Sequence, residues 1–344
     1  MYFHHVKRNP VRQFCWLFLS LLCISFTGQQ VRRIQITGRA QGTTYSIIYY
    51  HTDSVVTKRS VDSLLSTLDA SLSIYKPRSL INEFNASEKG VKPDSHLRHV
   101  ISKALTVFSA TDGAFDITIM PLTQAWGFGT ANNNEPPTDE QIKTILPCIG
   151  TQHLTLTRDS LLKSKPCVAI DVNGIAQGYS VDVLAALLET YGITNYLVEL
   201  GGEIKISGTK PGNQRMKIGI ESPAPGELQS GILKKVLILD SGAITTSGNY
   251  RKFYESRGRI VSHLFDPKTG YSINNELIST TVYAPDAITA DAYDNALMNM
   301  GLHKAMTFAS QHPPLAAYFI YRDSTGIIRD TATANFYPLI DKQQ

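Results

Sequence analysis

Strand-like and helix-like segments follow one another in this chain without a regular strand–helix–strand rhythm. Residues 37–50 alternate in polarity and are rich in Thr, Tyr and Ile, which predicts two strands around a tight turn at Gln41 and Gly42. Further strands are predicted at residues 167–172, 196–200, 217–221 and 236–240. This irregular order favours a mixed α+β fold with largely antiparallel sheets and flanking helices.

Three segments have the apolar spacing of amphipathic helices. They are residues 61–72, residues 96–110, and residues 175–191. Between the first two, Pro77 breaks the helical pattern and polar groups gather in a loop at residues 72–85. Loops of this kind carry binding groups more often than helices do.

Length and charge exclude several classes of protein. The chain has 344 residues, of which 42% are hydrophobic and 18% are charged, so it can bury a core as one large domain or two intimate lobes. Its net charge of +4 is modest, and much of it lies near the N-terminus. This distribution argues against a nucleic-acid-binding surface.

The N-terminus is predicted to be a targeting segment. Basic residues up to Arg12 precede an apolar run at residues 14–26, which is followed by small and polar residues. The run is shorter than a full membrane span, so residues 1–28 are interpreted as an export signal or N-terminal membrane anchor, placing the protein outside the cytoplasm. Cys23 is a candidate for lipid attachment, although Leu22 before it is large for that motif. A cleaved soluble form and an uncleaved tethered form stay open.

Two cysteines remain beyond the targeting segment, Cys148 and Cys167. An oxidising compartment permits them to pair but does not require it. The chain has no Cys-x-x-Cys motif and no Cys/His cluster, which argues against a structural zinc site.

An acidic segment near the C-terminus has the spacing of a metal site. Residues 290–300 predict a helix with Thr289 as its N-cap and Gly301 at its end. Three oxygen-bearing side chains then share one region of the helix surface: Asp291, Asp294 and Asn295. Oxygen ligands suit Mg²⁺ or Ca²⁺. The alternative is that Asp291 merely complements the helix dipole.

Residues 262–270 contain a histidine three positions before a carboxylate, followed by a turn. The pKa of an imidazole, about 6.5, suits His263 for proton abstraction at neutral pH. The alternative is that His263 caps the turn at Pro267.

Other segments have the composition of a nucleotide site. Residues 173–175 lead from a glycine turn into a helix, whose free N–H groups stabilise a phosphate. Residues 241–250 are rich in hydroxyls and glycines, which suit either phosphate donation or an ordinary turn. Residues 113–129 place aromatics between glycines, which suits a flat ring or a turn with a buried Trp. No P-loop or dinucleotide fingerprint occurs.

Seven motifs, taken in order, resemble those of the ApbE family of FAD:protein FMN transferases. The resemblance spans residues 38–301, and its motifs lie at residues 113–116, 126–129, 171–182, 199–202, 246–250, 263–270 and 290–295. It implies that residues 29–344 form a two-lobed single domain with the flavin between the lobes. It also implies Mg²⁺-dependent cleavage of the FAD pyrophosphate, transfer of the FMN phosphoryl moiety to a Thr or Ser hydroxyl of an acceptor redox protein, and release of AMP.

The resemblance also implies roles for individual residues. His263 is the expected general base and Asp291 the expected metal ligand. The metal set is Gly174, Ala176, Asp291, Asp294 and Asn295. The set expected to hold FAD is Tyr75, Asp112, Gly113, Ala114, Phe115, Asp171, Gln177, Thr246, Ser247, His263 and Asp266.

Two positions depart from the family pattern. Asn295 stands where the family usually has Thr, and Gln177 stands where many relatives have Lys or Glu. Two other activities therefore stay open: an FAD pyrophosphatase that uses water as the nucleophile, and a non-catalytic flavin carrier.

Overall fold

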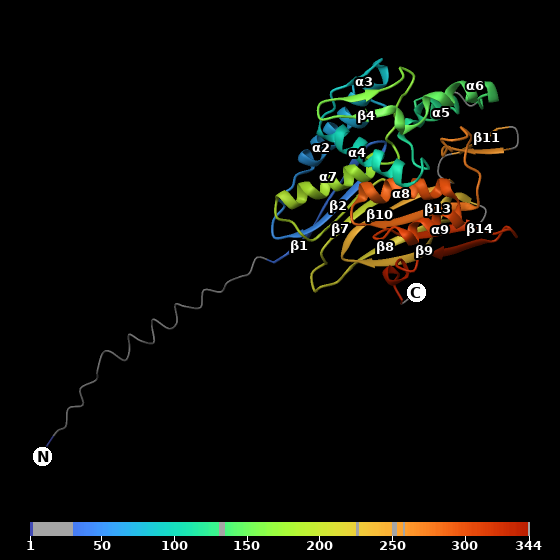
Figure 1. The fold of residues 1–344 in the computed structure, drawn as a ribbon. Helices are drawn as coiled ribbons and strands as arrows, with labels where there is room; N and C mark the ends of the chain where they lie inside the picture. The colour runs from blue at the N-terminus through green and yellow to red at the C-terminus, as the bar shows by residue number, and fades with distance from the viewer. Residues whose placement is uncertain (3–29, 131–134, 225–226, 250–252, 257–258, 343–344) are drawn as a thin grey trace.

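The computed structural model describes residues 1–2, 30–130, 135–224, 227–249, 253–256 and 259–342 (Figure 1). The predicted export signal or anchor, residues 1–28, lies almost wholly outside the described residues and stays a prediction. In the part of the chain that the structure describes, no helix has both the length and the apolar character needed to cross a membrane.

One eight-stranded sheet runs through the molecule, and all of its neighbouring strands are antiparallel. Its order is β1 (Arg32–Ala40), β2 (Thr43–His51), β6 (Tyr196–Leu200), β7 (Glu203–Ser207), β10 (Ser241–Gly248), β13 (Leu277–Ala284), β14 (Ala316–Arg322) and β15 (Ile328–Ala332). The predicted mixed α+β class with largely antiparallel sheet is confirmed.

Three smaller sheets complete the strand content of the described residues. They are β3 (Gly90–Val91) with β5 (Leu161–Lys163) and β4 (Leu154–Leu156), the hairpin β8 (Met216–Ala224) with β9 (Glu227–Leu239), and the hairpin β11 (Phe253–Ser256) with β12 (Arg259–Ser262). The predicted strands at residues 217–221 and 236–240 therefore belong to one hairpin outside the main sheet.

The predicted turn between the first two strands is confirmed. Gln41 and Gly42 have φ values of 50° and 76°, and Ala40 pairs with Thr43 across them. Two successive residues at positive φ match the right-handed twist of a two-residue hairpin, and glycine adopts this conformation without a steric cost.

Helices cover one face of the main sheet and fill the upper part of the molecule in Figure 1. They are α2 (Lys58–Leu72), α3 (Leu80–Ala86), α4 (Ser95–Ala110), α5 (Met120–Ala125), α6 (Asp139–Ile145), α7 (Ala176–Thr190), α8 (Ala287–Met300) and α9 (Leu302–Gln311). The three amphipathic helices predicted from the sequence correspond to α2, α4 and α7. The loop predicted at residues 72–85 is wrong in its second half, where helix α3 begins at Leu80 and Ser79 caps it by accepting the N–H of Asn82.

Successive side chains of the central strands point to opposite faces of the sheet and pack into separate cores. On β10, Ala243 faces the core that contains α2, α4, α7 and α8, whereas its neighbour Ile244 faces the core beneath the β8–β9 hairpin. On β14, Phe319 packs towards α8 and α9, whereas Tyr318 packs towards the hairpin. Because successive side chains of a strand point to opposite faces, one sheet serves both cores.

Two other local predictions were wrong. Residues 167–172 form no strand, although Val168, Ile170 and Val172 are buried. The hydroxyl-rich segment at residues 241–250, for which the sequence left a phosphate-binding stretch or a turn open, is mostly strand β10. Helix α8 begins at Ala287, one turn before the predicted start, because Asp286 is its N-cap and accepts the N–H of Thr289.

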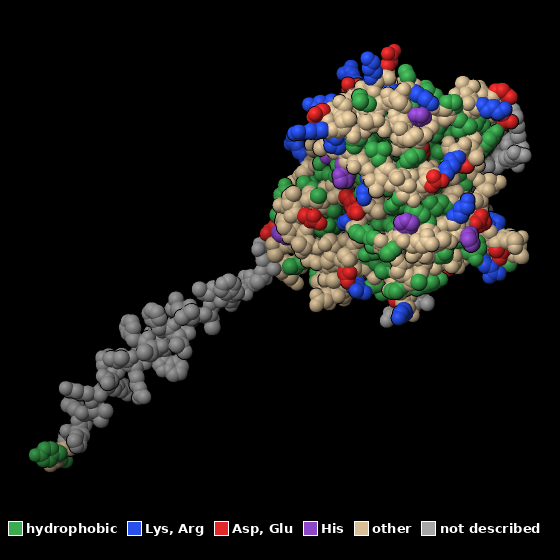
Figure 2. Space-filling model, viewed as in Figure 1, with side chains coloured by type: hydrophobic (Ala, Val, Ile, Leu, Met, Phe, Trp, Pro, Cys, Tyr) green, Lys and Arg blue, Asp and Glu red, His purple; other side chains and the backbone are tan. Residues whose placement is uncertain are grey.

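Cys148 and Cys167 form a disulfide, with 5.6 Å between their Cα atoms. This settles a pairing that the sequence left open. On the face of the molecule shown in Figure 2, basic side chains are interspersed with acidic and hydrophobic ones.

Candidate functional site

Helix α8 buries two carboxylates side by side. Asp291 is 4% exposed and Asp294 is 1% exposed, and the helix packs against β10, β13 and α7. Burial raises the pKa of Asp291 well above its ordinary value, and repulsion from Glu203 raises it further. Burial and repulsion from Asp291 likewise raise the pKa of Asp294. Among the described residues, no Lys or Arg forms an ion pair with either carboxylate.

The Asn295 side chain joins α8 to the turn before α7. Its amide nitrogen donates to Asp294 Oδ1 at 2.9 Å and to the backbone oxygens of Asp291 at 3.0 Å and Gly174 at 3.3 Å. The Ser247 hydroxyl donates to Asn295 Oδ1 at 3.4 Å. Four residues of the predicted metal set, Gly174, Asp291, Asp294 and Asn295, are therefore gathered in one place.

The first turn of α7 lies directly against α8. The N–H of Gly178 donates to Asp291 Oδ2 at 2.8 Å. A Cβ atom at position 178 would lie 2.3 Å from the Ala287 carbonyl oxygen, so only glycine permits this approach. Ala176, the fifth member of the predicted metal set, is the first residue of α7, and its carbonyl accepts the Ser180 hydroxyl at 2.8 Å.

Two further side chains border the acidic helix. Glu203, 8% exposed on β7, is close enough to raise the pKa of Asp291. The Gln177 amide lies next to the β6–β7 turn, since a Cβ atom at Gly201 would lie 2.9 Å from Gln177 Nε2 and 3.1 Å from Glu203 Oε2. Gln177 therefore faces the same acidic region as Asp291.

The predicted hydroxyl pair lies on β10, which α8 covers. Ser247 contacts Asn295, as described above, whereas the Thr246 hydroxyl lies 2.8 Å from the Thr281 hydroxyl of β13. Among the described hydrogen bonds, Ser247 therefore contacts the acidic helix through its side chain, and Thr246 does not.

Tyr75 lies next to the turn that carries Gly174. Its hydroxyl accepts the Asn173 amide at 3.5 Å, and burial first, then the Asp171 carboxylate, raises its pKa. Asp171 Oδ1 in turn accepts the N–H of Asn173 at 2.8 Å, which fixes the turn. Tyr75 is nevertheless 56% exposed, so most of its ring is available to a ligand.

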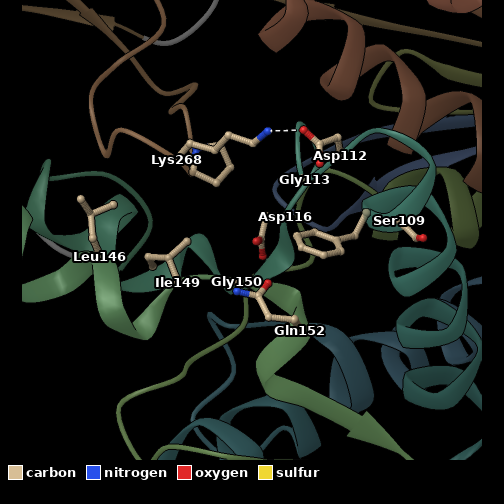
Figure 3. Close-up of a pocket in the computed structure, with 11 residues that line it drawn as sticks. Ser109, Asp112, Gly113, Asp116, Leu146, Ile149, Gly150, Gln152 and Lys268 are labelled. Carbon is tan, nitrogen blue, oxygen red and sulfur yellow. Dashed lines mark hydrogen bonds and ion pairs between the residues drawn. The ribbon is translucent and has the colours of Figure 1, made fainter.

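A pocket of about 610 Å³ opens at the end of α4 (Figure 3). Its walls come from the α4 end, from the segment after α6, and from the loop that follows His263. The lining residues are Phe108, Ser109, Asp112, Gly113, Asp116, Leu146, Ile149, Gly150, Gln152, Pro267 and Lys268. Two of the residues predicted to hold FAD, Asp112 and Gly113, therefore line a real cavity.

An ion pair crosses one side of this pocket. Lys268 Nζ lies 2.6 Å from Asp112 Oδ2, and Figure 3 shows the two side chains meeting from opposite walls. This hydrogen bond and charge lower the pKa of Asp112. Asp266 caps the Lys268 turn, because its two oxygens accept the Lys268 N–H and the Thr269 hydroxyl, each at 2.9 Å.

The segment at residues 113–116 is held from two sides. The Ala114 carbonyl accepts the Asn299 amide of α8 at 2.8 Å, which links the pocket to the acidic helix. Asp116 accepts the N–H and hydroxyl of Thr118 at 2.8 and 2.6 Å and the hydroxyl of Thr151 at 2.6 Å. Phe115 is 7% exposed, so it contributes to the core and not to an open binding surface.

An aromatic cluster supports the loop that carries His263. Trp126 stacks on Phe265 with 5.7 Å between ring centroids, and its indole N–H donates to the Gly270 carbonyl at 2.9 Å. Phe128 lies 5.7 Å from Phe265 and 6.4 Å from His263. The imidazole, directly after β12, therefore lies beside the partly buried Phe128 ring, which packs against Phe265.

Three contributors to this site escaped the sequence analysis: Glu203, Asn299 and Lys268. Lys268 and Asn299 each lie within a few residues of a predicted site residue, and Glu203 follows the Gly201-Gly202 turn. Their roles depend on contacts between segments that are distant in sequence. The only signal available was proximity to the recognised motifs.

The fold and the site define a class of α+β proteins in which a buried acidic helix lies on an antiparallel sheet beside an open pocket. Comparison with known proteins then identifies the group: a profile described as "ApbE family" matches residues 41–319, and this chain belongs to that family.

Relatives of known name are similar over nearly the whole chain. An FAD:protein FMN transferase of Vibrio cholerae is 32% identical over 95% of this chain and 99% of its own length. That of Escherichia coli K12 is 35% identical over 77% of each chain.

Solved structures show the same fold. The flavin transferase ApbE from Vibrio cholerae superposes with a TM-score of 0.80 at 31% identity, covering 90% of this chain and 100% of that one. The apo form of the Pseudomonas stutzeri flavinyl transferase ApbE gives 0.81 at 33% identity, covering 90% and 97%.

Proposed function

We propose that this protein is an extracytoplasmic, Mg²⁺-dependent FAD:protein FMN transferase. It moves the FMN phosphoryl moiety of FAD to a Thr or Ser hydroxyl of an acceptor redox protein and releases AMP. The observation that carries the proposal is the gathering of the Asp294 carboxylate and the backbone carbonyls of Asp291 and Gly174 around one side chain, Asn295, beside the buried Asp291 carboxylate. Membership of the ApbE family and the names of the relatives support the same activity.

The donor set of this site fits a hard divalent cation. Two buried carboxylates with raised pKa values have no cationic partner among the described residues, and a backbone carbonyl lies beside them. Such oxygens are the ligands that Mg²⁺ prefers. No group of three or more His, Cys, Asp or Glu side chains arranged to hold a metal occurs in the described chain, so Gly174, Ala176 and Asn295 would complete the set. When bound, Mg²⁺ would neutralise charge on the FAD pyrophosphate.

The other residues of the proposal bind the dinucleotide or take a proton from the acceptor. Tyr75, Asp171 and the pocket walls at Asp112 and Gly113 hold the dinucleotide, and Gln177 donates a neutral hydrogen bond near its phosphates. His263 takes the proton from the acceptor hydroxyl, since an imidazole is a competent base near neutral pH.

An acceptor assay tests the proposal against its alternatives. The full chain is incubated with FAD, Mg²⁺ and an acceptor bearing an Asp-Gly-x-Thr-Gly-Ala-like motif, with a Thr-to-Ala acceptor as the control. In-gel flavin fluorescence on the acceptor with its Thr, but not on the Thr-to-Ala acceptor, supports transfer. AMP release without a fluorescent acceptor indicates an FAD pyrophosphatase. The absence of both AMP release and acceptor fluorescence indicates a flavin carrier.

A further inference from the structure

The Asn295 amide sits among groups that would otherwise repel one another. Asp294 Oδ1 and the carbonyl oxygens of Gly174 and Asp291 all lie within 3.3 Å of its nitrogen. Each of these oxygens carries negative charge or partial negative charge, and each comes from a different residue. They converge on a single N–H₂ group, whose hydrogens bear partial positive charge.

The surroundings fix which end of the amide is the nitrogen. Three acceptors surround one terminal atom, and the Ser247 hydroxyl donates to the other at 3.4 Å. Only the arrangement with the N–H₂ group towards the acceptors satisfies both ends. The Asn295 oxygen therefore faces β10 and not the acidic oxygens.

We infer that the Asn295 N–H₂ group substitutes for the divalent cation in the metal-free enzyme. The inference rests on the proposed function, because it assigns the same oxygens to the metal. A cation that binds Asp294 and Gly174 must first displace the amide from them. Metal binding and rotation of the Asn295 side chain are thus one coupled step in this chain.

A threonine at position 295 would lack this property. A Thr hydroxyl has one hydrogen, and on a helix it commonly donates to the carbonyl four residues earlier, here that of Asp291. Asp294 and Gly174 would then lose their donor in the metal-free state. The Asn at position 295 therefore stabilises the empty site at the expense of metal affinity.

The test compares Asn295→Thr with the wild-type full chain in EDTA and in saturating Mg²⁺. We expect the variant to unfold at a temperature lower by about 4 °C in EDTA, as two hydrogen bonds are lost, and at nearly the wild-type temperature in Mg²⁺. Calorimetry should show that the variant binds Mg²⁺ about thirtyfold more tightly, because the free energy lost by the metal-free form is recovered on binding. Asn335→Thr is the control, because the Asn335 amide donates to the Leu315 carbonyl at 2.8 Å and has no contact with the acidic helix among the described hydrogen bonds. Its loss of stability should be equal in both buffers.

The outcomes separate this inference from the proposed function. If Asn295→Thr loses the same stability in EDTA and in Mg²⁺, or binds Mg²⁺ no more tightly than wild type, the inference is overturned and the metal site stands. If neither protein binds Mg²⁺, the metal site of the proposed function is overturned and the inference falls with it.

Discussion

The Gly178 N–H donates to Asp291 Oδ2 across a contact between α7 and α8 that leaves no space for a side chain. This bond fixes the orientation of the Asp291 carboxylate. The close approach of the two helices is therefore a condition for the acidic site.

Gly178→Ala tests that condition. Its Cβ would lie 2.3 Å from the Ala287 carbonyl oxygen and 2.7 Å from Asp291 Cβ, so the helices must separate. We expect a loss of about 1–3 kcal/mol in the free energy of unfolding and weaker Mg²⁺ binding. Chemical denaturation and calorimetry measure the two effects. Gly178 has no positive φ, so the loss would come from this crowding and not from backbone strain.

The stability of the metal-free protein should fall as the pH rises. Burial raises the pKa values of Asp291 and Asp294, so the folded state binds more protons than the unfolded state above the ordinary value of 3.8. Their stabilising contribution is complete below that value and is lost as the pH rises through the folded-state pKa values. Denaturation in EDTA between about pH 4 and pH 8 measures this slope.

Saturating Mg²⁺ should flatten the same pH profile, because the cation favours the ionised carboxylates. Asp291→Asn should flatten it in EDTA as well and abolish Mg²⁺-dependent turnover. A wild-type profile in EDTA that rises with pH in this range would contradict the assignment of two buried, cation-free carboxylates.

His263→Ala should slow transfer far more than it weakens FAD binding. Loss of a general base typically costs 10²- to 10⁴-fold in rate, whereas the pocket and the acidic helix keep their own contacts. Single-turnover transfer to the acceptor gives the rate, and flavin fluorescence titration gives the affinity. A variant that matches the wild-type rate with a protein acceptor would show that another group takes the proton.

The ion pair between Asp112 and Lys268 should matter for FAD binding more than for stability. Both side chains are largely exposed, at 97% and 60%, and exposed pairs contribute little to folding. The pair nevertheless joins two walls of the pocket, so Lys268→Ala should weaken FAD binding severalfold, and added salt should weaken the wild type in the same direction. Lys304→Ala, an exposed lysine of α9, is the matched control. Equal FAD affinities for both variants would argue against a role for the pair.

Local patterns predicted the parts of this fold that depend on local chemistry. The hairpin at Gln41 and Gly42 follows from turn residues, and α2 follows from a single apolar stripe. The strand prediction for residues 167–172 failed because alternating apolar residues are typical of a strand. In the structure the Ile170 backbone pairs instead with the Asn85 side chain. A hydrogen bond between residues 85 apart leaves no local signal.

The same distinction applies to the site. The spacing of Asp291, Asp294 and Asn295 predicts that they lie together, because about four residues span one helical turn. The direction of the Asn295 amide depends on Gly174 and Ser247, which lie 121 and 48 residues away. Spacing predicts which groups meet on one element, and tertiary packing decides what they do there.

The disulfide between Cys148 and Cys167 should stabilise both the fold and the pocket. It closes a loop with a sequence separation of 19 residues, for which chain entropy predicts about 3 kcal/mol. Cys148 lies between Leu146 and Ile149, which line the pocket, and Cys167 precedes the segment that leads to Asp171.

Dithiothreitol, or the double substitution Cys148→Ser with Cys167→Ser, should therefore lower the free energy of unfolding and weaken FAD binding together. Denaturation curves and fluorescence titrations of the oxidised, reduced and substituted proteins test this. The substituted protein should be insensitive to dithiothreitol, which controls for other effects of the reductant. A reduced wild type with full stability but weakened FAD binding would mean that the bond acts only on the pocket wall, and unchanged values for both would show that packing alone holds this segment.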